Sequence, residues 1–177
     1  MMPIFSVIGH TKTGKTTIIR DIVRGLRSRD YKVAVIKHDP QDHGNVDREG
    51  SDTSVFFEEG SSAVVLSSAS RLTIFRRVDE DTPPEDIIPL LGSVDCVILE
   101  GYKGWEYPKI EIWSAEKGEV KTNADLLMAI ICHDVHEKSL LLTSRPKNIS
   151  IFSIDELNNI LDFIEEKVLR GSGKGGE

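Results

Sequence analysis

Residues 9–16 read Gly9-His10-Thr11-Lys12-Thr13-Gly14-Lys15-Thr16. The order is a glycine, four residues, a second glycine, a lysine and a threonine, which is the phosphate-loop pattern. An apolar run, Ile4–Ile8, precedes it, and apolar residues recur at spacings of three and four from Ile18 to Leu26 after it. These patterns predict a buried strand and an amphipathic helix, in the order that a phosphate loop requires.

Each type of residue in this stretch has a chemical reason to be there. Gly9 and Gly14 allow a tight turn that brings backbone N–H groups and a helix N-terminus close to an anion. Lys15 would place a positive charge at the β- and γ-phosphates, and the Thr16 hydroxyl would bind Mg²⁺. The sequence therefore predicts a nucleotide-binding loop.

Composition limits the possible functions. The chain has 177 residues, 39% of them hydrophobic, and its net charge is −7. We expect one domain over residues 1–170, a disordered tail over 171–177, and no general nucleic-acid surface, since that would need clustered basic residues. Without an apolar stretch of about 20 residues or an N-terminal secretion signal, we expect a cytosolic protein. Cys96 and Cys132 lie in separate apolar runs, and we interpret both as reduced, buried strand cysteines.

The remaining chain predicts an α/β fold. Lys32–Lys37 completes a strand, helix and strand unit, whose two strands should be parallel. A long polar loop follows over Asp39–Gly50, either a nucleotide- or metal-sensitive segment or a solvated surface loop. Further elements are predicted as follows: a helix near 53–59, an antiparallel hairpin of 63–66 and 72–75, a short helix near 85–91, a half-exposed strand over 108–113, a buried strand over 126–132, and a final helix after the capping-box match Ser153–Glu156.

A second informative stretch is Val94–Glu100, an apolar strand that ends in an acid. In phosphate-loop NTPases an acid at this position holds Mg²⁺, directly or through water. Glu100 ends the strand and Asp95 opens it, so position favours Glu100 as the metal acid. Asp52, near a predicted helix start, could cap that helix or act on metal or water.

The strand end at His133-Asp134 is a candidate for base recognition, although it lacks the Asn-Lys-x-Asp pattern of many GTPases. The loop after Glu100 carries Tyr102, Lys103, Trp105 and Tyr107. Its aromatic residues could cover the core, or stack on a base or a partner. Lys103 is a candidate for an added catalytic charge.

Several of these segments together resemble the molybdopterin-guanine dinucleotide biosynthesis protein B family. They are GHTKTGKTT at 9–17, Lys37-His38, Gly50-Ser51-Asp52-Thr53 with Gly60, Leu99-Glu100-Gly101-Tyr102-Lys103, and Pro108-Lys109-Ile110. The resemblance covers most of the chain, and it implies a P-loop NTPase fold: a mostly parallel sheet flanked by helices, with an antiparallel hairpin extension.

The same resemblance implies a function and a set of partners. It implies a homodimer that binds GTP and Mg²⁺, hydrolyses GTP weakly, and assists a guanylyltransferase that attaches GMP to molybdopterin, itself a further possible ligand. The implied phosphate contacts are Gly9, His10, Thr11, Lys12, Thr13, Gly14, Lys15, Thr16 and Thr17, with Mg²⁺ near Thr16 and Glu100 and basic contacts at Lys37 and Lys103.

Two other classes use the same loop. A small-molecule kinase would need an acceptor pocket and usually a basic lid, whereas Arg71, Arg76 and Arg77 lie in or beside the predicted hairpin. A metal-insertion GTPase of the nickel-enzyme type would need gathered ligands, whereas the histidines are scattered and the cysteines are in apolar runs.

Overall fold

The computed structural model describes residues 2–41, 47–144 and 149–171. Its contacts divide the chain into two compact units, one formed by Met1–His38 with Ile88–Glu177 and the other by Asp39–Ile87. The predicted single domain over residues 1–170 stays a prediction. The predicted loop 39–50 lies partly, and the predicted tail 171–177 almost wholly, outside the described residues. No helix in the described ranges is long and apolar enough to cross a membrane.

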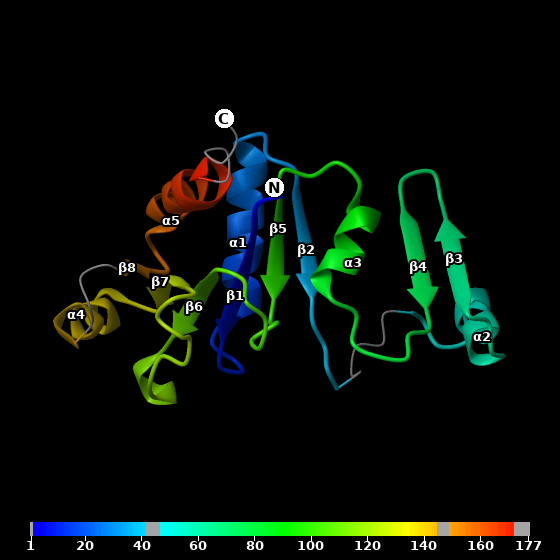
Figure 1. Cartoon of the computed structure of the whole chain (residues 1–177), viewed down its shortest axis with the longest axis horizontal. Coiled ribbons are helices and arrows are strands. Elements are labelled where there is room, and N and C mark those ends of the chain that lie inside the picture. The colour runs from blue at the N-terminus through cyan, green and yellow to red at the C-terminus, as the bar shows by residue number, and fades with distance from the viewer. Residues whose placement is uncertain (1, 42–46, 145–148, 172–177) are drawn as a thin grey trace. The chain divides into compact units, whose positions relative to one another are not determined.

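The first unit is built on a six-stranded sheet in the order β2-β5-β1-β6-β7-β8, with every neighbouring pair parallel (Figure 1). Its strands are β1 (Ile4–Gly9), β2 (Val33–Lys37), β5 (Cys96–Glu100), β6 (Lys109–Trp113), β7 (Leu127–Cys132) and β8 (Ser150–Ser153). Its helical elements are α1 (Lys15–Ser28), η1 (Ile88–Leu91), η2 (Ala115–Lys117), α4 (Val135–Ser144), α5 (Leu157–Ile164) and the π-helical turn η3 (Glu165–Leu169). The α/β fold with a mostly parallel sheet is therefore confirmed.

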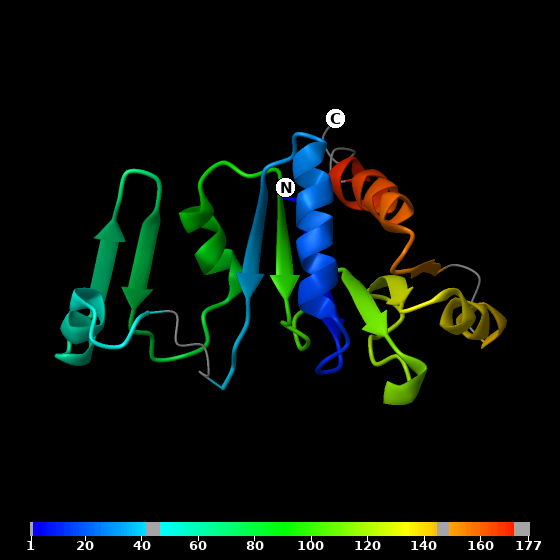
Figure 2. The same cartoon turned by 180° about the vertical axis from the view of Figure 1, so that it is seen from behind.

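Helices α1 and α5 pack together on one face of this sheet (Figure 2). The predicted apolar stripe of α1 is buried, with Ile18, Ile22 and Leu26 at most 1% exposed. Burying each such side chain contributes about 1.5–3 kcal/mol. The two helices approach closely at Gly25, where an added Cβ would lie 2.4 Å from Leu161 Cδ1. This packing fixes the helix whose first turn begins at the phosphate loop.

Helix α4 covers β7 and β8 through a separate apolar cluster. Along β7, Ala129 and Ile131 belong to the core of α1 and α5, whereas Ile130 and Cys132 belong to the cluster with α4. Neighbouring strand residues point to opposite faces, so α4 lies on the other face of the sheet. Strand β7 is thus buried on both sides, as its continuous apolar run predicts.

Strand β6 corrects one prediction. The alternation over residues 108–113 predicts a half-exposed strand, but β6 pairs with β1 on one side and β7 on the other, and Lys109 and Glu111 are only 2% and 1% exposed. Both faces of a central parallel strand are covered, so polar residues there are buried and need partners.

The capping-box prediction is half right. The Glu156 carboxylate does accept the Ser153 N–H, at 2.7 Å, but α5 begins only at Leu157 and has no side-chain cap hydrogen bond. The bond instead closes a turn between β8 and α5, in which Glu156 N–H donates to the Ser153 carbonyl at 2.9 Å.

The second unit contains α2 (Asp52–Glu58), the hairpin of β3 (Ala63–Ser67) and β4 (Leu72–Arg76), and α3 (Pro84–Ile87). The two strands form an antiparallel two-stranded sheet, which confirms the predicted hairpin. Ser51 caps α2 by accepting the Ser54 N–H at 3.2 Å, and the Arg77 guanidinium lies 4.3 Å from the centre of the Phe57 ring.

Candidate functional site

The phosphate loop joins β1 to α1 at the carboxyl end of the sheet. Its backbone has positive φ at Gly9 (155°), Lys12 (63°) and Gly14 (79°). At Gly9 a Cβ atom would lie 2.6 Å from the Ile112 carbonyl oxygen, so β6 leaves room for glycine only. Lys12 is not a glycine, so its positive φ is a strained backbone conformation that the surrounding structure must stabilise.

Lys15 and Thr13 define the inside of this loop. The Lys15 ammonium donates to the carbonyls of His10 at 2.5 Å and Gly9 at 3.3 Å, and the buried Thr13 hydroxyl donates to the same His10 carbonyl at 2.8 Å. Gly14 caps α1 without a side-chain hydrogen bond, so the N–H groups of the first turn remain available to an anion. The loop therefore fits a chain of phosphates: it offers an ammonium, backbone donors and the positive end of a 14-residue helix.

Glu100 lies next to this loop because β5 pairs with β1, placing Glu100 opposite Val7. Its Oε1 is 3.4 Å from the Thr16 hydroxyl oxygen. Asp95 lies before the other end of β5, where its carboxylate accepts the Lys32 N–H at 2.6 Å. A hydroxyl and a carboxylate are the oxygen donors that Mg²⁺ prefers, so the residues present fit this ion at Thr16 and Glu100.

Positive charge gathers around the same carboxylate. Burial lowers the pKa of Lys15 below its ordinary value, and the ammonium groups of Lys103 and Lys37 lower it further, whereas Glu100 opposes the shift. The two neighbouring lysines are exposed. Three ammonium groups that repel one another would all be stabilised by a polyanion, which favours phosphate binding.

Positive charges also surround His10. Burial lowers the pKa of its imidazole, Lys121, Lys103 and Lys117 add to the effect, and Glu111 opposes it. Its Nε2 is buried without a hydrogen-bond partner among the described residues. The backbone carbonyl of His10 accepts hydrogen bonds from Lys15 and Thr13. Thr11, Lys12 and Thr17 have exposed side chains.

The loop that follows Glu100 makes close aromatic contacts that its sequence alone does not predict. Tyr102 is 3% exposed and stacks on the His38 ring at a centroid distance of 4.5 Å, with the Trp105 ring edge-on to it at 5.8 Å. Gly101, at φ 96°, would place a Cβ only 3.3 Å from His38 Cβ. The Glu-Gly-Tyr sequence is thus explained by close packing of the turn after β5 against the end of β2.

Two buried charged groups of β6 support the surrounding loops. Lys109 donates to the carbonyls of Trp105 and Tyr107 (3.1 Å to the second), and burial lowers its pKa, opposed by Glu106. The Glu111 carboxylate accepts the N–H groups of Lys121 and Thr122, both at 2.9 Å, and the Thr122 hydroxyl at 2.5 Å. Sequence reasoning missed these roles, although a charge at alternate positions of a strand between two buried strands is the signal that could have found them.

Asp52 belongs to the second unit, where it is exposed in the first turn of α2. Its predicted action on metal or water stays a prediction. Cys96 and Cys132 are buried and free, as predicted, and burial raises the pKa of each thiol to about 11.

Comparison with known proteins points in one direction. A family model described as molybdopterin guanine dinucleotide synthesis protein B matches residues 4–133. A Haemophilus influenzae protein named molybdopterin-guanine dinucleotide biosynthesis adapter protein is 29% identical over 174 residues, covering 93% of this chain and 88% of that one. A Methanocaldococcus jannaschii protein putatively given the same name is 38% identical over 105 residues, covering 58% of this chain and 42% of that one.

The fold has solved counterparts as well. The crystal structure of Bacillus subtilis MobB superposes with a TM-score of 0.74 at 24% sequence identity, covering 99% of this chain and 100% of that chain. This likeness shows that the two chains share a fold.

Proposed function

The chain belongs to the molybdopterin guanine dinucleotide synthesis protein B family, and from this premise we propose that it is a GTP-binding adapter in molybdenum cofactor biosynthesis. It assists a guanylyltransferase that attaches GMP to molybdopterin, and by itself it hydrolyses GTP slowly. The proposal rests on the observation that Lys15, Thr16 and Glu100 lie together at the carboxyl end of strands β1 and β5. These are the groups that hold phosphates and Mg²⁺ in phosphate-loop proteins.

We expect slow hydrolysis from the groups that lie at this end of the sheet. The bound Mg²⁺ would neutralise phosphate charge, and Lys15 would orient the phosphate chain. Fast hydrolysis also needs a positioned water and an added cation, together a large factor in rate. The candidates are Asp52 for the water or metal and Lys103 for the charge, and Lys103 lies on an exposed loop position.

The partner surface proposed for the guanylyltransferase is the loop from Tyr102 to Tyr107. Lys109 donates a hydrogen bond to the Tyr107 carbonyl, and the His38 ring stacks on Tyr102. Lys103, Gly104 and Glu106 are exposed. A loop that is anchored beside the nucleotide and open to solvent can present the site to another protein.

A homodimer is part of the same proposal. The β3–β4 hairpin exposes Val65, Leu66, Leu72 and Ile74, each 48–63% exposed. Apolar side chains gathered on one small sheet favour burial against another protein surface.

Glu100→Gln keeps the shape of the side chain and removes its charge. We expect it to weaken Mg²⁺-dependent GTP binding by about tenfold or more, while GTP binding in EDTA changes little, because only the metal needs the carboxylate. Isothermal titration calorimetry at several Mg²⁺ concentrations measures this directly. Asp95→Asn is the matched control: if Asp95→Asn abolishes the magnesium dependence and Glu100→Gln does not, the assignment of the metal acid is wrong.

A further inference from the structure

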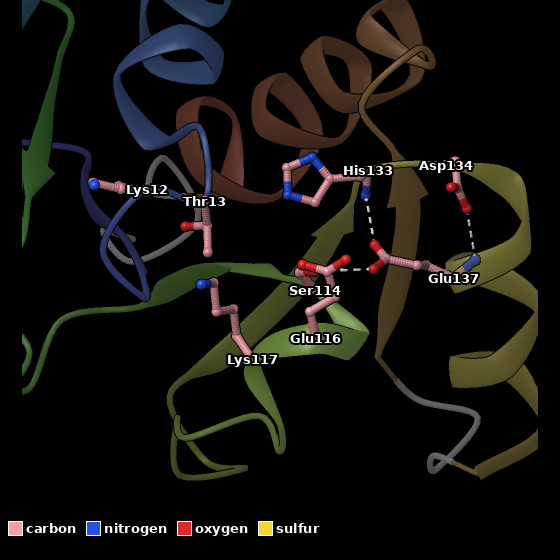
Figure 3. Close-up of a pocket in the computed structure, with 8 residues that line it drawn as sticks. All are labelled: Lys12, Thr13, Ser114, Glu116, Lys117, His133, Asp134 and Glu137. Atoms are coloured by element: carbon pink, nitrogen blue, oxygen red, sulfur yellow. Dashed lines mark hydrogen bonds between the residues drawn. The ribbon is translucent and has the colours of Figure 1, made fainter.

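The two sides of the phosphate loop are held together in different ways. On the side of β6 and β7, one carboxylate joins the segments that line a cavity of about 370 Å³, because Glu137 accepts the Ser114 hydroxyl at 3.1 Å and the His133 N–H at 3.0 Å (Figure 3). On the side of β5, which ends at Glu100, an aromatic cluster follows the strand end, and Tyr102 is its central ring. The wall that carries the proposed metal acid is therefore built from rings.

The Tyr102 ring has another ring on each of two sides. Tyr102 is only 3% exposed. The His38 ring stacks on it with the ring planes 26° apart, and the Trp105 ring lies edge-on to it at 76°. Stacked and edge-on arrangements are those that aromatic pairs prefer. Because His38 directly follows β2, the stack joins the turn after β5 to the end of β2.

The backbone of the same turn is strained and is held by hydrogen bonds. Gly101 and Tyr102 both have positive φ, 96° and 52°, and a tyrosine keeps such a conformation only where its surroundings enforce it. The Gly101 N–H donates to the Val7 carbonyl at 3.3 Å. The His38 N–H donates to the Glu100 carbonyl at 3.0 Å. With the Tyr102 ring stacked on His38 as well, the turn is fixed on both sides of Gly101.

The loop beyond Tyr102 is anchored a second time. The Trp105 N–H donates to the Tyr102 carbonyl at 3.2 Å. The buried Lys109 ammonium donates to the carbonyls of Trp105 and Tyr107, at 3.1 Å to the second. The Tyr102 ring therefore has fixed neighbours both from the end of β2 and from the loop before β6.

Glu100 is the functional group that this turn can position. Its Oε1 lies 3.4 Å from the Thr16 hydroxyl oxygen, and the residue is only partly buried. A glutamate side chain has several rotatable bonds and loses conformational freedom when it is held in one place. Because Mg²⁺ demands near-ideal octahedral geometry, the carboxylate can meet the ion only if the backbone at Glu100 is fixed. The turn that ends in the Tyr102 stack provides this fixed backbone.

We propose that Tyr102 is a positioning residue, whose ring, stacked on His38, holds the Glu100 carboxylate where Mg²⁺ and a bound nucleotide need it. The inference rests on the proposed binding of GTP and Mg²⁺ at the phosphate loop and adds the residue that acts through the metal acid. A ring that only filled the core would support stability and would leave the magnesium dependence of GTP binding unchanged.

The test compares the wild type, Tyr102→Leu and Tyr102→Phe in calorimetric titrations with GTP, once in Mg²⁺ and once in EDTA. Leucine keeps an apolar side chain and removes the ring, whereas phenylalanine keeps the ring. We expect Tyr102→Leu to weaken GTP binding in Mg²⁺ about three- to tenfold and to change binding in EDTA less than about twofold. Tyr102→Phe should stay within about twofold of the wild type in both conditions.

A double variant tests whether Tyr102 acts through Glu100. Once Glu100→Gln has removed the charge, adding Tyr102→Leu should weaken GTP binding in Mg²⁺ by less than about twofold further, because residues that act as one unit are not additive. Phe163→Leu is the matched control, since it removes a ring from another aromatic pair of the same unit, that of Phe152 and Phe163. It should leave GTP binding unchanged in both conditions.

Thermal melts of each protein show that it is folded at the temperature of the titration. Should Tyr102→Leu not fold, His38→Leu removes the other ring of the stack and takes its place, with the same expected result. Three results would overturn the inference: equal losses in Mg²⁺ and EDTA, a Tyr102→Phe protein as weak as Tyr102→Leu, or full additivity with Glu100→Gln. If the wild type binds GTP in a magnesium-dependent way and Tyr102→Leu does so equally well, only the inference fails. If the wild type binds no GTP, the proposed function fails with it.

Discussion

Lys15→Ala is expected to reduce GTP affinity by about 2–4 kcal/mol, or roughly 30- to 1,000-fold. The Lys15 ammonium donates to the loop carbonyls of Gly9 and His10, and charge-assisted contacts to phosphate are the strong ones. The fold should remain intact, since the hydrogen bonds of the ammonium within the described residues are to these two loop carbonyls.

Calorimetry with GTP and a thermal melt of the same protein measure both expectations. Lys32→Ala is a suitable control, because Lys32 is an exposed lysine just before the amino end of the edge strand β2, whereas the loop lies at the carboxyl end of the sheet. Equal GTP affinity in Lys15→Ala and Lys32→Ala would show that the loop is not the nucleotide site.

Glu111→Ala should lower the free energy of unfolding by about 2–4 kcal/mol, more than any other substitution proposed here. The carboxylate is 1% exposed and accepts three separate donors from Lys121 and Thr122. Removing it leaves these donors without their acceptor inside the protein, and a buried group that lacks a partner is costly.

Urea denaturation measures this change in the free energy of unfolding, when both proteins are fitted with the same dependence of that free energy on urea concentration. Glu119→Ala removes an exposed carboxylate two residues away from Lys121, and it should change stability by less than about 0.5 kcal/mol. If Glu111→Ala were as stable as Glu119→Ala, the network around β6 would not hold the loop as described.

Local patterns predicted the part of the site that lies close in sequence. The loop from Gly9 to Thr16, the strand before it and the stripe of α1 follow from spacing alone, and the acid at the end of an apolar strand identified Glu100. These features depend on residues within one element, so one element suffices to find them.

The parts that were missed depend on neighbours distant in sequence. Whether Lys109 and Glu111 are exposed depends on β1 and β7 lying on both sides of β6, which alternation alone does not reveal. Helix α4 escaped because its apolar residues do not form one stripe: Leu141 is buried, whereas Leu140 and Leu142 beside it are 45% and 61% exposed. Strand β8 has only four residues and gives too short a pattern.

The spacing Asp134-x-x-Glu137 was a usable signal that went unused. An N-cap acid followed three residues later by glutamate marks a helix start, which here is that of α4.

The protein is proposed to support GTP use by a separate guanylyltransferase. The most direct measurement is the rate of molybdopterin guanylylation by a purified guanylyltransferase at limiting GTP, with and without this protein, beside its GTP turnover alone. We predict that the protein raises the guanylylation rate, that Lys15→Ala does not, that substitutions of Lys103 and Trp105 reduce the effect, and that turnover alone stays below about 1 s⁻¹. An unchanged guanylylation rate, or rapid GTP hydrolysis without any partner, would contradict the account.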